Sequence, residues 1–168
     1  MRNYKNKAYI AFDGDKDIHY FNMIKAWSQN EKLDFSIYDA HDLNTARDSS
    51  TEETIKTRLR ERMNNSKVML LLIGESTKYL YKFVKYELEY ALKNEIPIIA
   101  VNLNNKRERD LNRVPPIIRD ELVVHISFNL KIIQHAIKSW PDDYKKLKTN
   151  NEIGARYYTG TIYDNLGL

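Results

Sequence analysis

The sequence contains no cysteine. This absence excludes disulfide bonds and thiolate metal ligands, and it is typical of proteins that work in a reducing compartment. No apolar run approaches the roughly 20 residues that a membrane-spanning helix needs, and no basic segment followed by an apolar run precedes the first polar residues. We therefore expect a cytoplasmic protein with no membrane partner.

Glycine and proline are also scarce, with five and four residues respectively. The glycines do not cluster where an expected strand ends, as a phosphate-binding loop or a nucleophile elbow requires. These absences exclude P-loop enzymes and Rossmann dehydrogenases. What is present is 42% hydrophobic and 30% charged residues, a balance typical of a folded chain that buries a core without disulfides.

The net charge excludes fewer functions than the scarcity of cysteine and glycine does. The formal net charge is only +4, and residues of both signs are interspersed along the chain. Nucleic-acid-binding proteins usually gather their basic residues on one patch or stripe. We therefore expect no nucleic-acid partner, whereas an anionic small ligand is compatible with this charge.

Short apolar segments alternate with segments of helical periodicity. Phe21, Ile24 and Trp27, for example, have the spacing of one helix face. Ser50 and Glu53 form a capping-box pattern, which predicts that another helix begins just after Ser50. A long polar loop, residues 39–50, precedes it. The expected strands are residues 7–12, 35–38, 68–73, 96–101 and 122–126, and the last two expected helices are residues 79–94 and 130–140.

This alternation predicts an α/β fold, because parallel strands need crossover connections, which are usually helices. We expect a flavodoxin-like three-layer sandwich, a five-stranded parallel sheet of order 2-1-3-4-5 with helices on both faces. In that order the topological switch lies between the first and third strands, where ligands bind outside the carboxyl ends of the strands. Residues 12–17, residues 74–78 and the helix at 79–94 would form the walls of that crevice.

The helix expected at 79–94 carries a glutamate on its apolar side. At roughly 100° per residue, Glu87 falls near the middle of the apolar arc that includes Val84, Leu88 and Ala91, whereas Glu89 falls on the opposite face. One interpretation is a structural carboxylate paired with an arginine at the helix–sheet interface. The other is a carboxylate that faces the crevice, where it can hold hydroxyl groups or stabilise positive charge.

Metal-binding patterns are incomplete. Residues 13–17 have the acidic spacing that opens an EF-hand loop, but Ile18 and Ile24 stand where its glycine and its last glutamate belong. The four histidines include no pair at helical i, i+4 spacing, so we expect no metal. His125 lies inside an expected strand, and we interpret it as a core histidine with satisfied hydrogen bonds. A receiver domain would need an aspartate at the end of the third strand, where the chain has Ile73 and then glycine.

Three stretches together carry a family resemblance. They read KAYIAFDGDKD, DFSIYDAHDLNTARDSSTEETIKTRLRERMNNSKVMLLLIGESTKYLYKFVKYELEYAL and PPIIRDELVVHISFNLKIIQHAI. The chain resembles Toll/interleukin-1 receptor (TIR) domains and, more closely, the TIR-like sensor proteins of the bacterial Thoeris antiphage system. The resemblance covers residues 7–140. It implies a TIR-like domain over residues 1–140, followed by an appendage, residues 141–168, packed on that domain or on a partner.

The resemblance implies an enzyme that cleaves NAD⁺, with NAD⁺ as its substrate and no cofactor. The TIR pattern of an aromatic residue four positions before a glutamate places the catalytic role on Glu87 and a substrate-binding role on Phe83. Phe12 matches an aromatic residue that stacks on nicotinamide. The remaining substrate-binding residues that it implies are Asp13, Arg47 and Ser76.

Thoeris relatives imply a particular product and particular partners. We expect a cyclic ADP-ribose isomer that diffuses to a separate effector protein, with activity that stays latent until infection. A phage-derived trigger and a homo-oligomer are further expected partners. Two alternatives stay open: a TIR adaptor without enzymatic activity, and a plain NAD⁺ hydrolase. The sequence does not identify the nucleophile that would close the ring.

Overall fold

The computed structural model describes residues 7–30, 32–38 and 51–168. It contains one all-parallel sheet with the strand order β2-β1-β3-β4-β5-β6. The predicted α/β class and the predicted order are confirmed, and a sixth strand extends the sheet beyond β5. The strands are β1 Lys7–Ala11, β2 Ser36–Tyr38, β3 Val68–Ile73, β4 Ile98–Asn102, β5 Val124–Ser127 and β6 Arg156–Tyr157.

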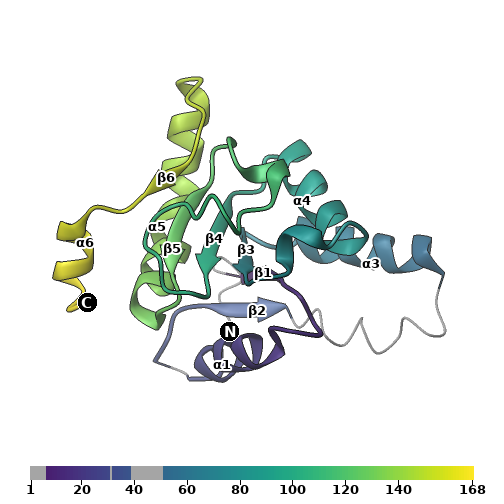
Figure 1. The fold of residues 1–168 in the computed structure, drawn as a ribbon, viewed down its shortest axis with the longest axis horizontal. Coiled ribbons are helices and arrows are strands. Elements are labelled where there is room, and N and C mark those ends of the chain that lie inside the picture. Colours follow the sequence, from purple (N-terminus) through teal and green to yellow (C-terminus); the bar gives the residue numbers. More distant parts are fainter. Residues whose placement is uncertain (1–6, 31, 39–50) are drawn as a thin grey trace.

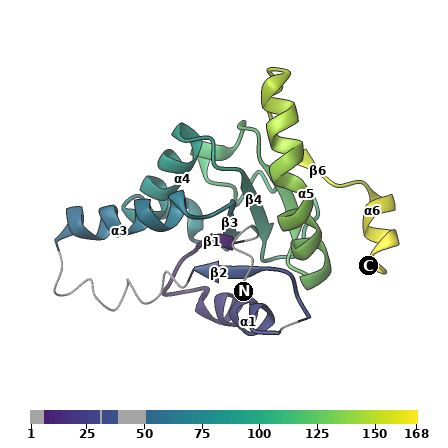
Figure 2. The same cartoon turned by 180° about the vertical axis from the view of Figure 1, so that it is seen from behind.

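Helices cover both faces of this sheet, as Figures 1 and 2 show. Alternate residues of each strand point to opposite faces, so Ile10 packs with α1 and α5, whereas Ala11 packs with α3 and α4. All six residues of β3 are buried, as expected of a central parallel strand. The helices are α1 Ile18–Ser28, α3 Glu52–Asn64, α4 Phe83–Lys93, α5 Leu130–Thr149 and α6 Gly160–Asn165, with short 3₁₀ turns η2 Thr77–Tyr79 and η3 Pro116–Ile118.

Helix α3 begins one residue later than its capping pattern predicts. The Oγ1 atom of Thr51 accepts a hydrogen bond from the backbone N–H of Thr54 at 3.2 Å. Thr51 is therefore the N-cap, and Ser50 lies outside the described residues. The capping pattern places the N-cap at Ser50, but the backbone geometry places it at Thr51.

Helix α5 corrects the prediction that the last helix ends at residue 140. It continues to Thr149 with Pro141 inside it. A proline inside a helix costs about 3 kcal/mol, but Trp140, Pro141 and Tyr144 are all buried. The apolar face of α5 thus continues through the proline, and its packing outweighs the local cost.

The chain beyond α5 also joins the domain. The backbone N–H of Arg156 donates to the carbonyl of Val123 at 2.8 Å, and β6 pairs in parallel with β5. Tyr163 of α6 is buried in the same core cluster as Trp140. The two-residue length of β6 and its lack of apolar alternation explain why no strand was predicted there. Contact of residues 141–168 with a partner stays a prediction.

No helix in the described part of the chain is both long enough and apolar enough to cross a membrane.

His125 is fully buried in β5, but the expectation that its hydrogen bonds are satisfied is wrong. Neither ring nitrogen has a hydrogen-bond partner among the residues that the structure describes. Burial, with a smaller contribution from the charge of Arg109, lowers the pKa of His125 from 6.5 to about 4. The ring is therefore neutral at pH 7 and behaves as a core side chain.

This buried histidine predicts a measurable loss of stability in mild acid. The unfolded chain takes up a proton at His125 below pH 6.5, whereas the folded chain does so only near pH 4. The free energy of unfolding should therefore fall by about 2 kcal/mol between pH 7 and pH 5 through this residue alone. Urea unfolding of wild type and of His125→Leu at both pH values measures it. An equal loss in the two proteins would contradict the prediction.

Candidate functional site

A cavity of about 560 Å³ opens at the carboxyl end of β1, beside α4. It lies at the topological switch between β1 and β3, where the sequence predicts the ligand site. We call it the Glu87 cavity. Its walls are formed by Phe12, Asp13, Gly14, Asp15, Tyr79, Leu80, Tyr81, Lys82, Phe83, Val84 and Glu87.

Glu87 reaches this cavity from the buried side of α4. Val84, Leu88 and Ala91 anchor that side of the helix in the core, and the side chain of Glu87 between them is only 6% exposed. Glu89, two positions along the chain, is 53% exposed and faces Lys85 at 3.8 Å. The helix begins at Phe83 instead of residue 79, because η2 and an extended residue precede it. The predicted position of Glu87 on the apolar face is nevertheless correct.

Two aromatic side chains line the same cavity. Phe12 follows β1 directly, and its ring stacks on Phe21 of α1 with the centroids 4.7 Å apart and the planes 5° from parallel. One face of Phe12 is therefore covered by the core, and only the remainder of the ring can meet a ligand. Phe83 is half-buried at the start of α4, with the ammonium group of Lys82 at 5.3 Å from its ring centroid.

Asp13 and Ser76 join the loops that follow β1 and β3. The hydroxyl of Ser76 donates to Oδ2 of Asp13 at 2.6 Å. The other oxygen, Oδ1, accepts backbone N–H bonds from Asp15 at 3.0 Å and Lys16 at 3.2 Å. Asp13 is buried, so these bonds satisfy a carboxylate that would otherwise be costly to remove from water. The pair fixes the relative position of the two loops.

The site residues that the sequence predicts fall into three groups. Phe12, Asp13, Phe83 and Glu87 come together at the Glu87 cavity. Ser76 does not line that cavity and contacts it only through Asp13. Arg47 lies outside the described residues.

A second cavity of about 470 Å³ lies on the other side of the Asp13–Ser76 pair, and the sequence analysis did not anticipate it. We call it the Asp17 cavity. It is bounded by the loops after β1, β3 and β4 and by the first turn of α1. Its walls are formed by Lys16, Asp17, His19, Tyr20, Gly74, Glu75, Ser76, Leu103, Asn104 and Arg113.

Asp17 occupies an unusual position in this second cavity. It is the N-cap residue of α1, yet its carboxylate caps no backbone N–H of the helix. The side chain instead lies against Gly74, where any Cβ would overlap the carboxylate. Burial, and secondarily the charge of Asp13, raises the pKa of Asp17. The available sequence signal was Gly74, a glycine directly after the apolar run of β3. It could not point to Asp17, because the two residues are far apart in the chain.

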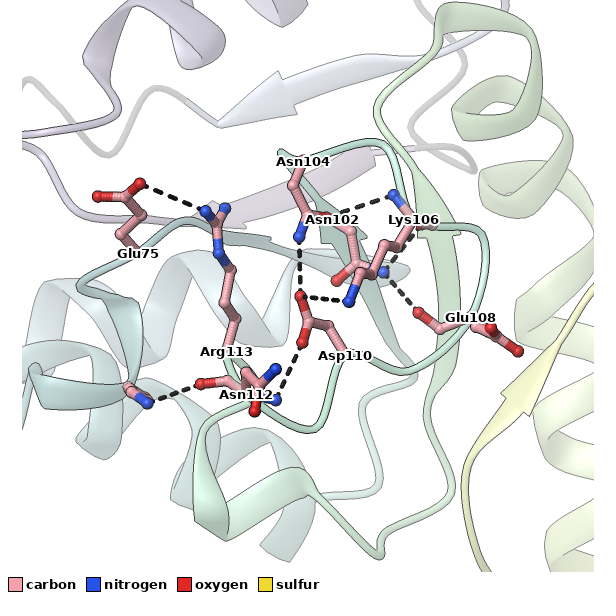
Figure 3. A network of polar contacts seen from close by, with 9 residues as sticks. Glu75, Asn102, Asn104, Lys106, Glu108, Asp110, Asn112 and Arg113 are labelled. Atoms are coloured by element: carbon pink, nitrogen blue, oxygen red, sulfur yellow. Dashed lines mark hydrogen bonds and ion pairs between the residues drawn. The ribbon is translucent and has the colours of Figure 1, made fainter.

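Arg113 is placed by a polar network in the loop between β4 and β5 (Figure 3). The Asn104 side chain donates to Oδ2 of buried Asp110 at 2.8 Å, and the backbone N–H of Asn112 donates to Oδ1 at 2.9 Å. Although burial alone would raise the pKa of Asp110, these hydrogen bonds lower it below its usual value. The network shapes the loop so that Arg113 reaches Glu75 at 3.4 Å.

The Asp13–Ser76 bond predicts a specific stability cost. Ser76→Ala leaves one oxygen of a buried carboxylate without its donor, so the free energy of unfolding should fall by about 1.5–3 kcal/mol. Ser66→Ala is the matched control, because that hydroxyl donates only to the carbonyl of Arg62 within its own helix end, and it should change stability by less than about 0.5 kcal/mol. Denaturant titration compares the two. Equal effects would show that the Ser76 bond adds nothing beyond a local contact.

Most residues of this site lie in a segment that matches a known family. Residues 9–108 match the family model described as the TIR-like domain of the Thoeris protein ThsB. The match includes Phe12, Asp13, Ser76, Phe83 and Glu87, and it spans more than half of the 168 residues. The chain therefore belongs to the family of the TIR-like domain of the Thoeris protein ThsB.

Proposed function

We propose that this protein cleaves NAD⁺ at the bond between nicotinamide and C1′ of its ribose, using Glu87, and that it does so in antiphage signalling. Family membership supports a role in Thoeris antiphage defence signalling. The observation that carries the chemical proposal is Glu87 itself, a buried carboxylate on the apolar face of α4 at the wall of a ligand-sized cavity. A helix that served only as a scaffold would not need a carboxylate at that position.

The chemistry of this bond needs such a carboxylate. Nicotinamide leaves as a neutral ring with the bonding electron pair, so positive charge develops on the ribose as C1′ becomes oxocarbenium-like. A fixed negative charge stabilises that state most effectively where water is excluded. In the proposal, Glu87, which is only 6% exposed, supplies this charge and also accepts hydrogen bonds from the ribose hydroxyls.

The neighbouring residues have supporting roles in this proposal. Phe12 and Phe83 hold the nicotinamide ring and keep water away from C1′. Asp13 is already engaged by Ser76 and by two backbone N–H groups, so it shapes the cavity and is not free to act as a second charged group at C1′. In the proposal, Glu87 is the carboxylate that faces the reacting atom.

The product depends on which nucleophile reaches C1′. An adenine nitrogen or a ribose hydroxyl of the same molecule, losing its proton, would close a cyclic ADP-ribose isomer. Water in its place would give linear ADP-ribose. We propose the cyclic product, a messenger that diffuses to a separate effector protein, because the likeness to Thoeris TIR proteins implies it. The protein would be latent until infection provides a trigger.

Glu87→Gln tests the catalytic assignment. The substitution keeps the size of the side chain and removes its charge, so nicotinamide release from NAD⁺ should fall by roughly 10²–10³-fold. Purified protein is incubated with NAD⁺, with and without lysate from phage-infected cells, and the products are identified by mass spectrometry. Glu89→Gln is the control on the same helix, and it should retain wild-type activity because Glu89 faces solvent.

Three outcomes separate the alternatives. A cyclic isomer that is lost in Glu87→Gln and retained in Glu89→Gln supports the cyclase. Linear ADP-ribose with the same dependence on Glu87 indicates a plain hydrolase. No nicotinamide from the triggered wild type, or equal release by Glu87→Gln, would favour an adaptor without enzymatic activity.

A further inference from the structure

The proposed cleavage at Glu87 leaves the Asp17 cavity without a role. Its most unusual group is the Asp17 carboxylate, which is only 8% exposed. The Oδ2 atom of this carboxylate has no hydrogen-bond partner among the described residues. A buried carboxylate oxygen without a donor costs free energy, so a ligand that brings an N–H or O–H group to it would gain an unusually strong bond.

Basic side chains line the same cavity, beside the carboxylates of Asp17 and Glu75. Lys16 lines it from the loop after β1, His19 from the first turn of α1, and Arg113 from the loop after β4. Arg113 is bound only loosely by Glu75, whose side chain is 87% exposed and screened by solvent. A free inorganic anion would meet the charges of Lys16 and Arg113 but would also be repelled by Asp17. The cavity therefore suits a ligand that carries both an anionic group and a hydrogen-bond donor.

The two cavities are neighbours and share a wall. Residues of the loop after β1 line both, and the Asp13–Ser76 hydrogen bond stands between them. Their volumes, about 560 and 470 Å³, each lie within the range of small-ligand sites. Tyr20 and Leu103 provide the Asp17 cavity with apolar surface that can contact a flat base. A dinucleotide could place one nucleotide in each cavity, with its pyrophosphate crossing the Asp13–Ser76 pair.

We propose that the Asp17 cavity binds the second nucleotide of the dinucleotide whose nicotinamide end lies in the Glu87 cavity. In this arrangement Oδ2 of Asp17 accepts a hydrogen bond from an amino or hydroxyl group of that nucleotide, and Lys16 and Arg113 contact its phosphate. The inference rests on the proposed function for the identity of the dinucleotide. The raised pKa of Asp17 agrees with a carboxylate that lacks a partner until the ligand arrives.

Gly74 has a definite role in this proposal. Any side chain at residue 74 would displace the Asp17 carboxylate. Gly74→Ala should therefore remove the same ligand contact as Asp17→Asn while keeping the charge of Asp17. The two substitutions act on one interaction by different physical routes, so a shared loss of binding cannot be attributed to charge alone.

The test uses adenosine monophosphate as the probe for the second nucleotide. Isothermal titration calorimetry on the intact protein should show binding that weakens at least about tenfold in Asp17→Asn and in Gly74→Ala, the loss expected for one hydrogen bond to a charged group. Asp142→Asn is the control, because Asp142 is an exposed residue of α5, and it should bind like wild type. Thermal melting of each variant shows that it is folded.

The outcomes distinguish this inference from the proposed catalysis. Unchanged binding by both variants, no binding by wild type, or inorganic phosphate binding as tightly as adenosine monophosphate would each overturn it. Glu87→Gln should bind adenosine monophosphate like wild type. Loss of binding in Glu87→Gln would show that adenosine monophosphate binds in the Glu87 cavity and would overturn the inference. Asp17-dependent binding by a protein that releases no nicotinamide even with lysate from phage-infected cells would reject the catalytic proposal and leave the binding site standing.

Discussion

The parallel pairing of β1 with both β2 and β3 is the constraint on which the rest of the structure depends. Because the strand order reverses at β1, the connections on its two sides leave toward opposite faces of the sheet. The loops after β1 and β3 therefore diverge at the carboxyl edge and leave space between them. Both cavities lie in that space. The burial of all six apolar residues of β3 stabilises this pairing.

Buried carboxylates are concentrated at this same edge. Asp13, Asp17 and Glu87 are each less than a tenth exposed, and all three come from segments next to the switch point. Removing a carboxylate from water is costly, so their grouping supports the ligand site proposed at this edge. Asp13 is satisfied within the protein by Ser76 and two backbone groups. Asp17 is held against Gly74, which has no side chain to exclude it.

The spacing of apolar residues predicted the strands and helices well where buried residues recur at regular intervals. The continuous apolar run of β3 and the spacing of Val84, Leu88 and Ala91 in α4 are properties of short segments, so the strand and the orientation of Glu87 could be read directly. Prediction failed where packing outweighed a local signal. Pro141 looked like the end of a helix, but α5 continues through it because the residues around it are buried. A two-residue strand such as β6 has too short a pattern to detect.

By itself the sequence determined the α/β class and the place of Glu87 on the apolar face of its helix, because periodicity and alternation act over a few neighbouring residues. The strand order followed from the common arrangement of such α/β folds. The tertiary structure alone decided that Ser76 bonds Asp13, that Asp17 lies on Gly74 and that Arg113 reaches the same cavity. These contacts join loops that follow three different strands. Their meeting depends on how distant segments pack around the sheet, which no local pattern encodes.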